Sequence, residues 1–357
     1  MAALQQVITA LNGEVPEFTP LTAYSGLAEK MCSPKKLKEF NDRGFVMVQH
    51  TFDSVEYIEH GVEFQKVEKI IGNDKYLCFR KVTPVGTIEQ VSKNGWHHES
   101  FIKSSDDYKI LKWIANNTEV IYKQDKYEEH FKNAGENNFI LPAGIIIKND
   151  INDIDLWEVI RTPFMRLNVD YAGVQQFCLD LAMETPELFE LNNCWTNLFN
   201  KTIKAFAKSE IPYIKIFENL TISMMGPKVY EEYLAPHYET CAKLFKPKNQ
   251  KFCVHFDGQL QAAKNVIAKG SFSIIESLTE PPEGDMTYDK CREAWPDKVF
   301  WANISAESSK KDGAELKDEI CSMIERGGKK GFLLEFAEHI PENGDEKINV
   351  ILEALGL

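Results

Sequence analysis

His255 and Asp257 form the most specific local pattern in the sequence, a histidine and an aspartate separated by one residue. In an extended strand, residues two apart point to the same side, so an imidazole and a carboxylate can converge on one point. With Glu276 and Glu338 they would supply nitrogen and oxygen ligands for Zn²⁺ or another divalent metal. The same groups could instead form a metal-free acid/base set in which the carboxylates raise the pKa of the imidazole. A structural pair beneath a loop is the third interpretation.

Other polar residues follow predicted strands and are expected to position a substrate: Glu218, Asn219 and Asn303. Asn219 could instead cap a strand-end turn. Arg166 is expected to bind a substrate carboxylate, because a guanidinium can hold two carboxylate oxygens at once; a surface ion pair is the alternative. Catalysis is expected from His255, Asp257 and Glu276, and metal ligation from His255, Asp257 and Glu338.

The second half of the chain alternates between strand-like and helix-like segments. Short runs of β-branched and aromatic residues predict the strands, and stretches with helical periodicity follow each of them. The predicted strands are 213–217, 251–254, 273–275, 299–302 and 331–334, and the predicted helices are 228–245, 260–268, 288–295, 314–326 and 346–355. Strands that are each followed by a helix predict parallel βα units. Pro236 falls inside the first helix, so a kink is expected there.

Two architectures accept such units, the doubly wound sheet and the eight-stranded barrel. A doubly wound nucleotide-binding protein usually carries a Gly-rich phosphate loop, but the sequence contains neither GxGxxG nor GxxxxGK[ST]. A barrel places functional groups at the carboxyl ends of its strands, and polar or ionisable residues follow every predicted strand. The predicted fold class is therefore α/β, a single (β/α)8 TIM-type barrel domain over residues 1–357 with a β-rich extension at about 40–100. Residues 103–134 are expected to be helical.

Composition excludes several classes of protein. The chain has 357 residues, with 41 basic and 54 acidic side chains and a net charge of −13, which argues against a protein that binds duplex nucleic acid or an anionic membrane. We expect no membrane-spanning segment and no signal peptide. Its eight cysteines are scattered without a CxxC pair, so we expect reduced thiols in a cytoplasmic protein rather than a disulfide framework.

Two segments, 211–245 and 251–286, carry motifs of a known superfamily. The matching residues are Gly226-Pro227, Tyr230, Glu232-Tyr233, Pro236 and Tyr238 in the first segment, and His255, Asp257-Gly258 and Ile274-Ile275-Glu276 in the second. With this pattern the chain resembles the uroporphyrinogen decarboxylase superfamily over roughly residues 75–357. The resemblance implies the barrel fold that the strand pattern also predicts.

The superfamily contains enzymes of two kinds, decarboxylases and methyltransferases, and the sequence is more similar to the methyltransferases. True uroporphyrinogen decarboxylases carry an Arg-rich substrate loop near the N-terminus, whereas the first 60 residues here contain only Arg43. The other branch comprises methyltransferases of corrinoid-dependent systems, whose zinc is held by a His-x-Cys and a distant Cys. Asp257 stands at the first cysteine position, and Glu338 lies near the second. Nitrogen and oxygen ligands alone make a harder site than thiolates do.

The resemblance therefore implies a methyltransferase-like enzyme of a corrinoid-dependent demethylation system. Its expected cofactor is a divalent metal, first of all zinc, and its expected partners are a small-molecule methyl donor and a corrinoid protein; a homodimer is also considered. Two alternatives remain open. One is a decarboxylase that acts on a tetrapyrrole or a smaller carboxylate, and the other is a non-catalytic barrel that binds a tetrapyrrole or a corrinoid.

Overall fold

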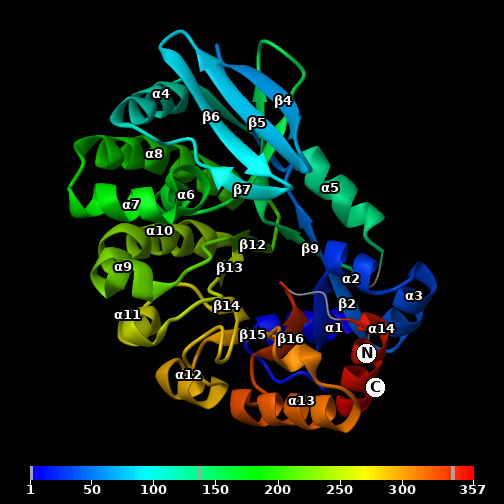
Figure 1. Cartoon of the computed structure of the whole chain (residues 1–357). Helices are drawn as coiled ribbons and strands as arrows, with labels where there is room; N and C mark the ends of the chain where they lie inside the picture. Colours follow the sequence, from blue (N-terminus) through cyan, green and yellow to red (C-terminus); the bar gives the residue numbers. More distant parts are fainter. Residues whose placement is uncertain (1–2, 136–137, 339–341) are drawn as a thin grey trace. The chain divides into compact units, whose positions relative to one another are not determined.

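The computed structural model describes residues 3–135, 138–338 and 342–357. Contacts divide the chain into two compact units. The barrel unit comprises residues 1–51, 127–143 and 212–357, and the insert unit comprises residues 52–126 and 144–211. Figure 1 shows both units in the colours of the sequence. The prediction of one domain over the whole chain stays a prediction. Among the described residues, no helix is long and apolar enough to cross a membrane.

Eight parallel strands form the nearly closed barrel, which confirms the predicted fold class. In hydrogen-bonded order they are β12 (Tyr213–Ile216), β13 (Lys251–His255), β14 (Ile274–Leu278), β15 (Val299–Asn303), β16 (Phe332–Phe336), β1 (Leu21–Tyr24), β2 (Phe45–Thr51) and β9 (Asn138–Pro142). Strands β9 and β12 stand at the two ends of this order, and the ring centres of Phe139 on β9 and Tyr213 on β12 lie 5.4 Å apart. The barrel is filled by side chains such as Trp301, and helix α1 (Ala3–Leu11) packs its apolar face against this core.

Helices lie between the barrel strands and after the last one, as the sequence pattern predicts for the second half of the chain. They are α2 (Ser25–Met31), α3 (Pro34–Asp42), α5 (Gln124–Asn133), α9 (Ile222–Val229), α10 (Ala235–Phe245), α11 (Lys264–Ala268), α12 (Tyr288–Ala294), α13 (Gly313–Gly327) and α14 (Gly344–Ala354). The helix predicted at 228–245 is interrupted before Pro236 rather than at it. A π-helical turn over Tyr230–Leu234 separates α9 from α10, and it accommodates a proline that lacks the backbone N–H of a regular helix.

The insert unit contains two antiparallel or mixed sheets. One has the order β11 (Leu156–Val159), β10 (Gly144–Asn149), β3 (Val55–Glu59), β8 (Thr118–Tyr122), and the other has the order β4 (Glu63–Ile71), β5 (Asp74–Thr83), β6 (Gly86–Lys93), β7 (Trp96–Glu99). Its helices are α4 (Ser105–Asn116), α6 (Pro163–Arg166), α7 (Gly173–Ala182) and α8 (Pro186–Lys208), with a π-helical turn at Leu167–Ala172. Two sequence-based expectations are corrected here. Strand β8 interrupts the segment expected to be helical, and β2 belongs to the barrel rather than to the β-rich extension.

A buried ion pair lies at the centre of the insert unit. Lys81 donates from Nζ to Oε1 of Glu59 at 2.8 Å, and both side chains are almost completely buried. Nearby, Arg166 pairs with Glu158 at 2.6 Å, and its guanidinium lies 4.4 Å from the ring centre of Trp195. Charges this deeply buried are tolerated only when each has a partner.

Candidate metal and catalytic site

The candidate site lies at the carboxyl ends of the neighbouring barrel strands β13 and β14 and of β16, which is separated from β14 by β15. His255 is the last residue of β13, Glu276 lies in β14, and Glu338 follows β16 by two residues. Asp257 follows His255 by two residues. The carboxyl end of a βα barrel is where such enzymes place their active sites, since the loops there come together around the barrel axis.

His255 is anchored through one nitrogen to the neighbouring strand. It stands opposite Glu276 in the ladder of β13 and β14, and its Nδ1 lies 2.7 Å from Oε2 of that carboxylate. Both side chains are buried. Burial alone would lower the pKa of His255, but the charge of Glu276 raises it above its ordinary value. A carboxylate that accepts the Nδ1 proton leaves Nε2 as the nitrogen that can bind a ligand.

A buried lysine holds the other oxygen of Glu276. Lys215 of β12 and the hydroxyl of Tyr24 at the end of β1 each lie 2.5 Å from Oε1, and Lys215 also donates to Tyr24 at 2.5 Å. Burial by itself raises the pKa of Glu276, but the charge of Lys215, and after it that of His255, brings the pKa well below its usual range. Glu276 is therefore ionised at neutral pH.

Nε2 of His255 faces two carboxylates. It lies 3.6 Å from Oδ2 of Asp257 and 3.7 Å from Oε1 of Glu338. One ligand atom from each of these three residues can be chosen so that all lie within 4.8 Å of one another. The structure thus brings together the three residues that the sequence analysis named as metal ligands. That they bind a metal stays a prediction.

Two residues with left-handed backbone support these carboxylates. Asn219 has a φ of 48° and donates from Nδ2 to Oδ2 of Asp257 at 3.1 Å. Ser277 has a φ of 57° and donates from Oγ to Oε1 of Glu338 at 2.6 Å. Residues other than glycine occupy this region at an energetic cost, and such residues gather at functional sites.

A close approach of two loops fixes the path of the chain after Asp257. A Cβ added to Gly258 would lie 2.6 Å from the carbonyl oxygen of Leu220. Contacts this short do not occur between well-packed atoms, so the position requires glycine. The glycine lets the loop after β13 pack against the loop that carries Asn219, and this packing places the amide beside the carboxylate.

Beneath this cluster lies one more carboxyl group, that of Glu335 in β16. The backbone N–H of Ser277 donates to its Oε1 at 2.9 Å, and the side chain is fully buried. Burial, and after it the charge of Glu276, raises its pKa well above the ordinary value. The raised pKa of Glu335 disfavours the state in which both neighbouring carboxyl groups are charged.

Three residues beneath the candidate ligands, Lys215, Tyr24 and His50, were not predicted from the sequence. Lys215 lies between two isoleucines in a buried four-residue strand, and a lysine in such a run is the signal that could have revealed it. Tyr24 and His50 pack edge to face, with ring centres 4.4 Å apart. Nε2 of His50 is buried and, in the described part of the chain, accepts and donates no hydrogen bond. Burial, and after it the charge of Lys215, lowers its pKa well below the ordinary value, so His50 is neutral.

The residues expected to position a substrate make contacts within the protein, and their role toward a substrate stays a prediction. Glu218 is fully buried and accepts a hydrogen bond from the hydroxyl of Tyr238 at 2.9 Å. Asn303 donates to Oγ1 of Thr279 and accepts from the backbone N–H of Ala337, each at 3.2 Å. Of the predicted set, Asn219 is the one that contacts a candidate ligand.

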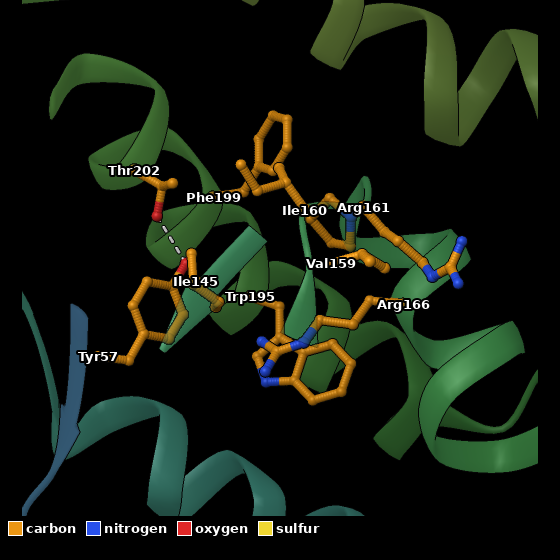
Figure 2. A pocket seen from close by; sticks show the side chains of 10 residues that line it. Tyr57, Ile145, Val159, Ile160, Arg161, Arg166, Trp195, Phe199 and Thr202 are labelled. Carbon is orange, nitrogen blue, oxygen red and sulfur yellow. Dashed lines mark hydrogen bonds between the residues drawn. The ribbon is translucent and has the colours of Figure 1, made fainter. Parts of the chain in front are cut away.

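Arg166 belongs to the insert unit, where it lines a small internal cavity. Figure 2 shows its guanidinium beside the indole of Trp195. The cavity measures about 20 Å³, enough for a single water molecule and too small for a substrate. On its far side, the hydroxyls of Tyr57 and Thr202 lie 2.6 Å apart. Arg166 pairs with Glu158 in this structure, and its expected role in binding a substrate carboxylate stays a prediction.

Comparison with models of known families finds no match for this sequence, and comparison with curated proteins finds none either. Solved structures do match. A methyltransferase from Methanosarcina mazei aligns with 100% of this chain and 98% of its own, at 12% identity and a TM-score of 0.55. A B12-independent methionine synthase from Shewanella sp. W3-18-1 aligns with 90% of this chain and 84% of its own, at 10% identity and a TM-score of 0.41.

The first likeness defines the class of fold, an α/β barrel similar to that methyltransferase over the whole of this chain. This agrees with the barrel fold that the resemblance noted in the sequence implies. At this level of identity the likeness concerns the fold, and the chemistry has to be argued from the residues of the site.

Proposed function

We propose that this protein is a methyltransferase that uses a divalent metal, first of all zinc, to remove a methyl group from a small donor molecule for a corrinoid-dependent system. The observation that carries the proposal is the cluster of His255, Asp257 and Glu338 at the carboxyl end of the barrel, with its histidine anchored through Nδ1. The fold shared with a methyltransferase supports the reaction class.

The residues present fit a metal ion. Metal-binding histidines usually donate their second ring N–H to a carboxylate, which fixes the tautomer, and Glu276 occupies that place for His255. Oδ1 of Asp257 is buried and, in the described part of the chain, makes no hydrogen bond, so an acceptor is available beside the cluster. Histidine nitrogen and carboxylate oxygen are both zinc ligands, and a catalytic zinc ion with three protein ligands keeps a fourth position for substrate.

A bound divalent ion would polarise the oxygen, nitrogen or sulfur atom that carries the methyl group of the donor. Asn219 and Ser277 keep the two carboxylates in place while the donor binds. In the overall reaction the bond between heteroatom and methyl carbon breaks, and the heteroatom keeps the electron pair and takes up a proton. The methyl group is transferred to Co(I) of a separate corrinoid protein, whose cobalt supplies the electron pair for the new bond.

Decarboxylation of a tetrapyrrole is less well supported. Binding several substrate carboxylates requires several available cations. The lysine in this site, Lys215, is already held by Glu276 and Tyr24. The cluster that faces the barrel mouth contains two carboxylates, which would repel an anionic substrate unless a metal neutralised them.

The experiment measures metal content and methyl transfer on the same purified samples. We expect the wild-type protein to retain about one divalent ion per chain and to transfer methyl groups from methanol, methylamine, dimethyl sulfide or anisole to free cob(I)alamin, as one ligand set implies one ion. The His255→Ala variant should lose both the metal and the transfer. The matched control is His98→Ala, which removes an exposed histidine from β7 in the insert unit.

Each outcome bears on the proposal. Retained transfer in His255→Ala would contradict it. Transfer without metal in the wild-type protein would replace metal assistance with acid/base chemistry. Metal without transfer from any of these donors would favour a binding protein over an enzyme.

A further inference from the structure

Besides the cavity shown in Figure 2, the insert unit contains a smaller internal cavity beside its buried ion pair. This cavity measures about 10 Å³, which is close to the volume of a single water-sized sphere. Its lining includes five buried residues with polar groups: Glu59, Lys81, Thr118, Arg166 and Tyr171. A cavity of this size binds water when it offers the molecule roughly two to four polar partners, and it stays dry when its walls are apolar.

One carboxylate oxygen on the wall of this cavity needs a partner. Glu59 accepts through Oε1 from Nζ of Lys81 at 2.8 Å. Its Oε2 is buried and, among the described residues, makes no hydrogen bond. A buried carboxylate oxygen without a donor is costly. Burial raises the pKa of Glu59, but protonation at Oε2 would create an O–H donor that equally lacks an acceptor.

Two cations that line the same cavity have N–H donors left over. The ammonium of Lys81 carries three donors, and its hydrogen bond in the described part of the chain is the one to Glu59. Arg166 donates from Nε and Nη2 to Glu158, and from Nη2 also to the hydroxyl of Tyr171. The N–H groups of Nη1 therefore have no protein acceptor among the described residues. The cavity thus offers an acceptor and several donors to one small molecule.

We propose that one water molecule is bound in this cavity, where it donates to Oε2 of Glu59 and accepts from Lys81 and Arg166. The bound water joins the ion pair of Lys81 and Glu59 to that of Arg166 and Glu158. Water fits these walls because it both donates and accepts, whereas a cation would face two cations and an anion would face a carboxylate. The volume excludes a larger ligand. This inference does not depend on the proposed methyltransferase activity.

Magnetic relaxation dispersion of water ²H and ¹⁷O, which counts water molecules that stay bound for long times, tests the proposal. The double variant Glu59→Leu/Lys81→Met should hold one long-lived water fewer than wild type, because its cavity loses the carboxylate and the ammonium. Replacement of both partners is used because it leaves no buried charge unpaired. The matched control, Glu190→Leu/Lys112→Met, removes an exposed ion pair of the insert unit and should keep the wild-type count.

A high-resolution crystal structure of the wild-type protein gives a second, independent readout. It should show a water oxygen within hydrogen-bond distance of Oε2 of Glu59. Circular dichroism and melting temperature establish that both double variants are folded. An empty cavity in the wild-type crystal structure overturns the proposal, and so does an equal count of long-lived waters in wild type and the folded Glu59→Leu/Lys81→Met protein. If that variant does not fold, the wild-type crystal structure alone decides.

Discussion

His255 and Glu276 stand opposite each other on adjacent parallel strands, and Nδ1 of the imidazole lies 2.7 Å from Oε2 of the carboxylate. This single contact determines the ring nitrogen that faces the barrel mouth. It also links the candidate ligands to Lys215 and Tyr24 below, because Glu276 contacts all three groups.

The first prediction concerns this contact. Glu276→Gln should weaken metal binding by about 10- to 100-fold, because the amide is a poorer acceptor for the Nδ1 proton and the imidazole is no longer held in one tautomer. Titration of the metal-free protein with zinc, followed by calorimetry, measures the change. Asn303→Asp, a change of similar size near the end of β15, serves as the control. Unchanged zinc affinity in Glu276→Gln would show that the carboxylate does not support a ligand.

Lys215→Met should lower both stability and metal retention. The lysine is fully buried against Glu276, and removal of one partner of a buried ion pair typically costs about 3–5 kcal/mol. Without the lysine the pKa of Glu276 rises, and the carboxylate loses a contact that holds it beside His255. Chemical denaturation and metal analysis give the two readouts.

Lys298→Met provides a matched control for Lys215→Met. Lys298 is another buried lysine, and its Nζ donates only to the carbonyls of Gly270 and Phe272 in the contacts described, each at 2.9 Å. The control should alter stability and leave the metal in place. Equal metal loss in both variants would mean that unfolding, rather than the network around Glu276, releases the ion.

A third prediction is a pH dependence of stability from His237 of α10. Burial lowers its pKa from 6.5 to about 4. The unfolded chain therefore binds more protons than the folded one between these values, so stability is fully present above pH 6.5 and is lost as the pH falls toward 4. The loss is at most about 3 kcal/mol.

Denaturation at several pH values separates this contribution from others. His237→Leu should show a shallower decline of the free energy of unfolding over that window than wild type does. His98→Leu, at an exposed site, should decline as wild type does. If the free energy of unfolding declines with pH equally in wild type and His237→Leu, groups other than His237 cause the acid sensitivity.

The fourth prediction addresses the insert unit. Lys81→Met leaves Glu59 as an unpaired buried carboxylate and should destabilise this unit by about 3–5 kcal/mol. Because the two units have separate cores, differential scanning calorimetry should show a lowered transition for the insert unit while zinc binding to the barrel unit is retained. Loss of zinc binding in a folded Lys81→Met protein would show that the two units are coupled.

The second half of the barrel could be predicted from the sequence because each strand there is a short apolar run followed by a helical stretch. Strand β13 with His255 and strand β16 before Glu338 both have this form, so their polar ends could be recognised. Strand β1 has only four residues, and the next two barrel strands, β2 and β9, are separated in the sequence by the first segment of the insert unit. A local pattern does not reveal such a split, because the strands become neighbours only in the folded chain.

Prediction of the site from the sequence is limited in the same way. Candidate ligands at strand ends could be named one by one, since strand ends in a barrel converge. The network below them could not, because Tyr24 and Lys215 are 191 residues apart in the sequence and meet only across the barrel. A lone lysine or tyrosine in an apolar run gives no indication of its partner.

The pairing of β1 with β16 has a consequence for how the chain folds. Leu21 lies beside Leu334 in this ladder, so the barrel can close only after the last strand has formed and paired with the first. Contacts that join such distant parts of a chain form late, because the loop between them must first be ordered. During synthesis the N-terminal strand must remain without this neighbour until nearly the whole chain has left the ribosome, and its open edge is then exposed to other nascent chains. Chaperone dependence during synthesis is therefore an expected property of this protein, and it originates in a single strand of four residues.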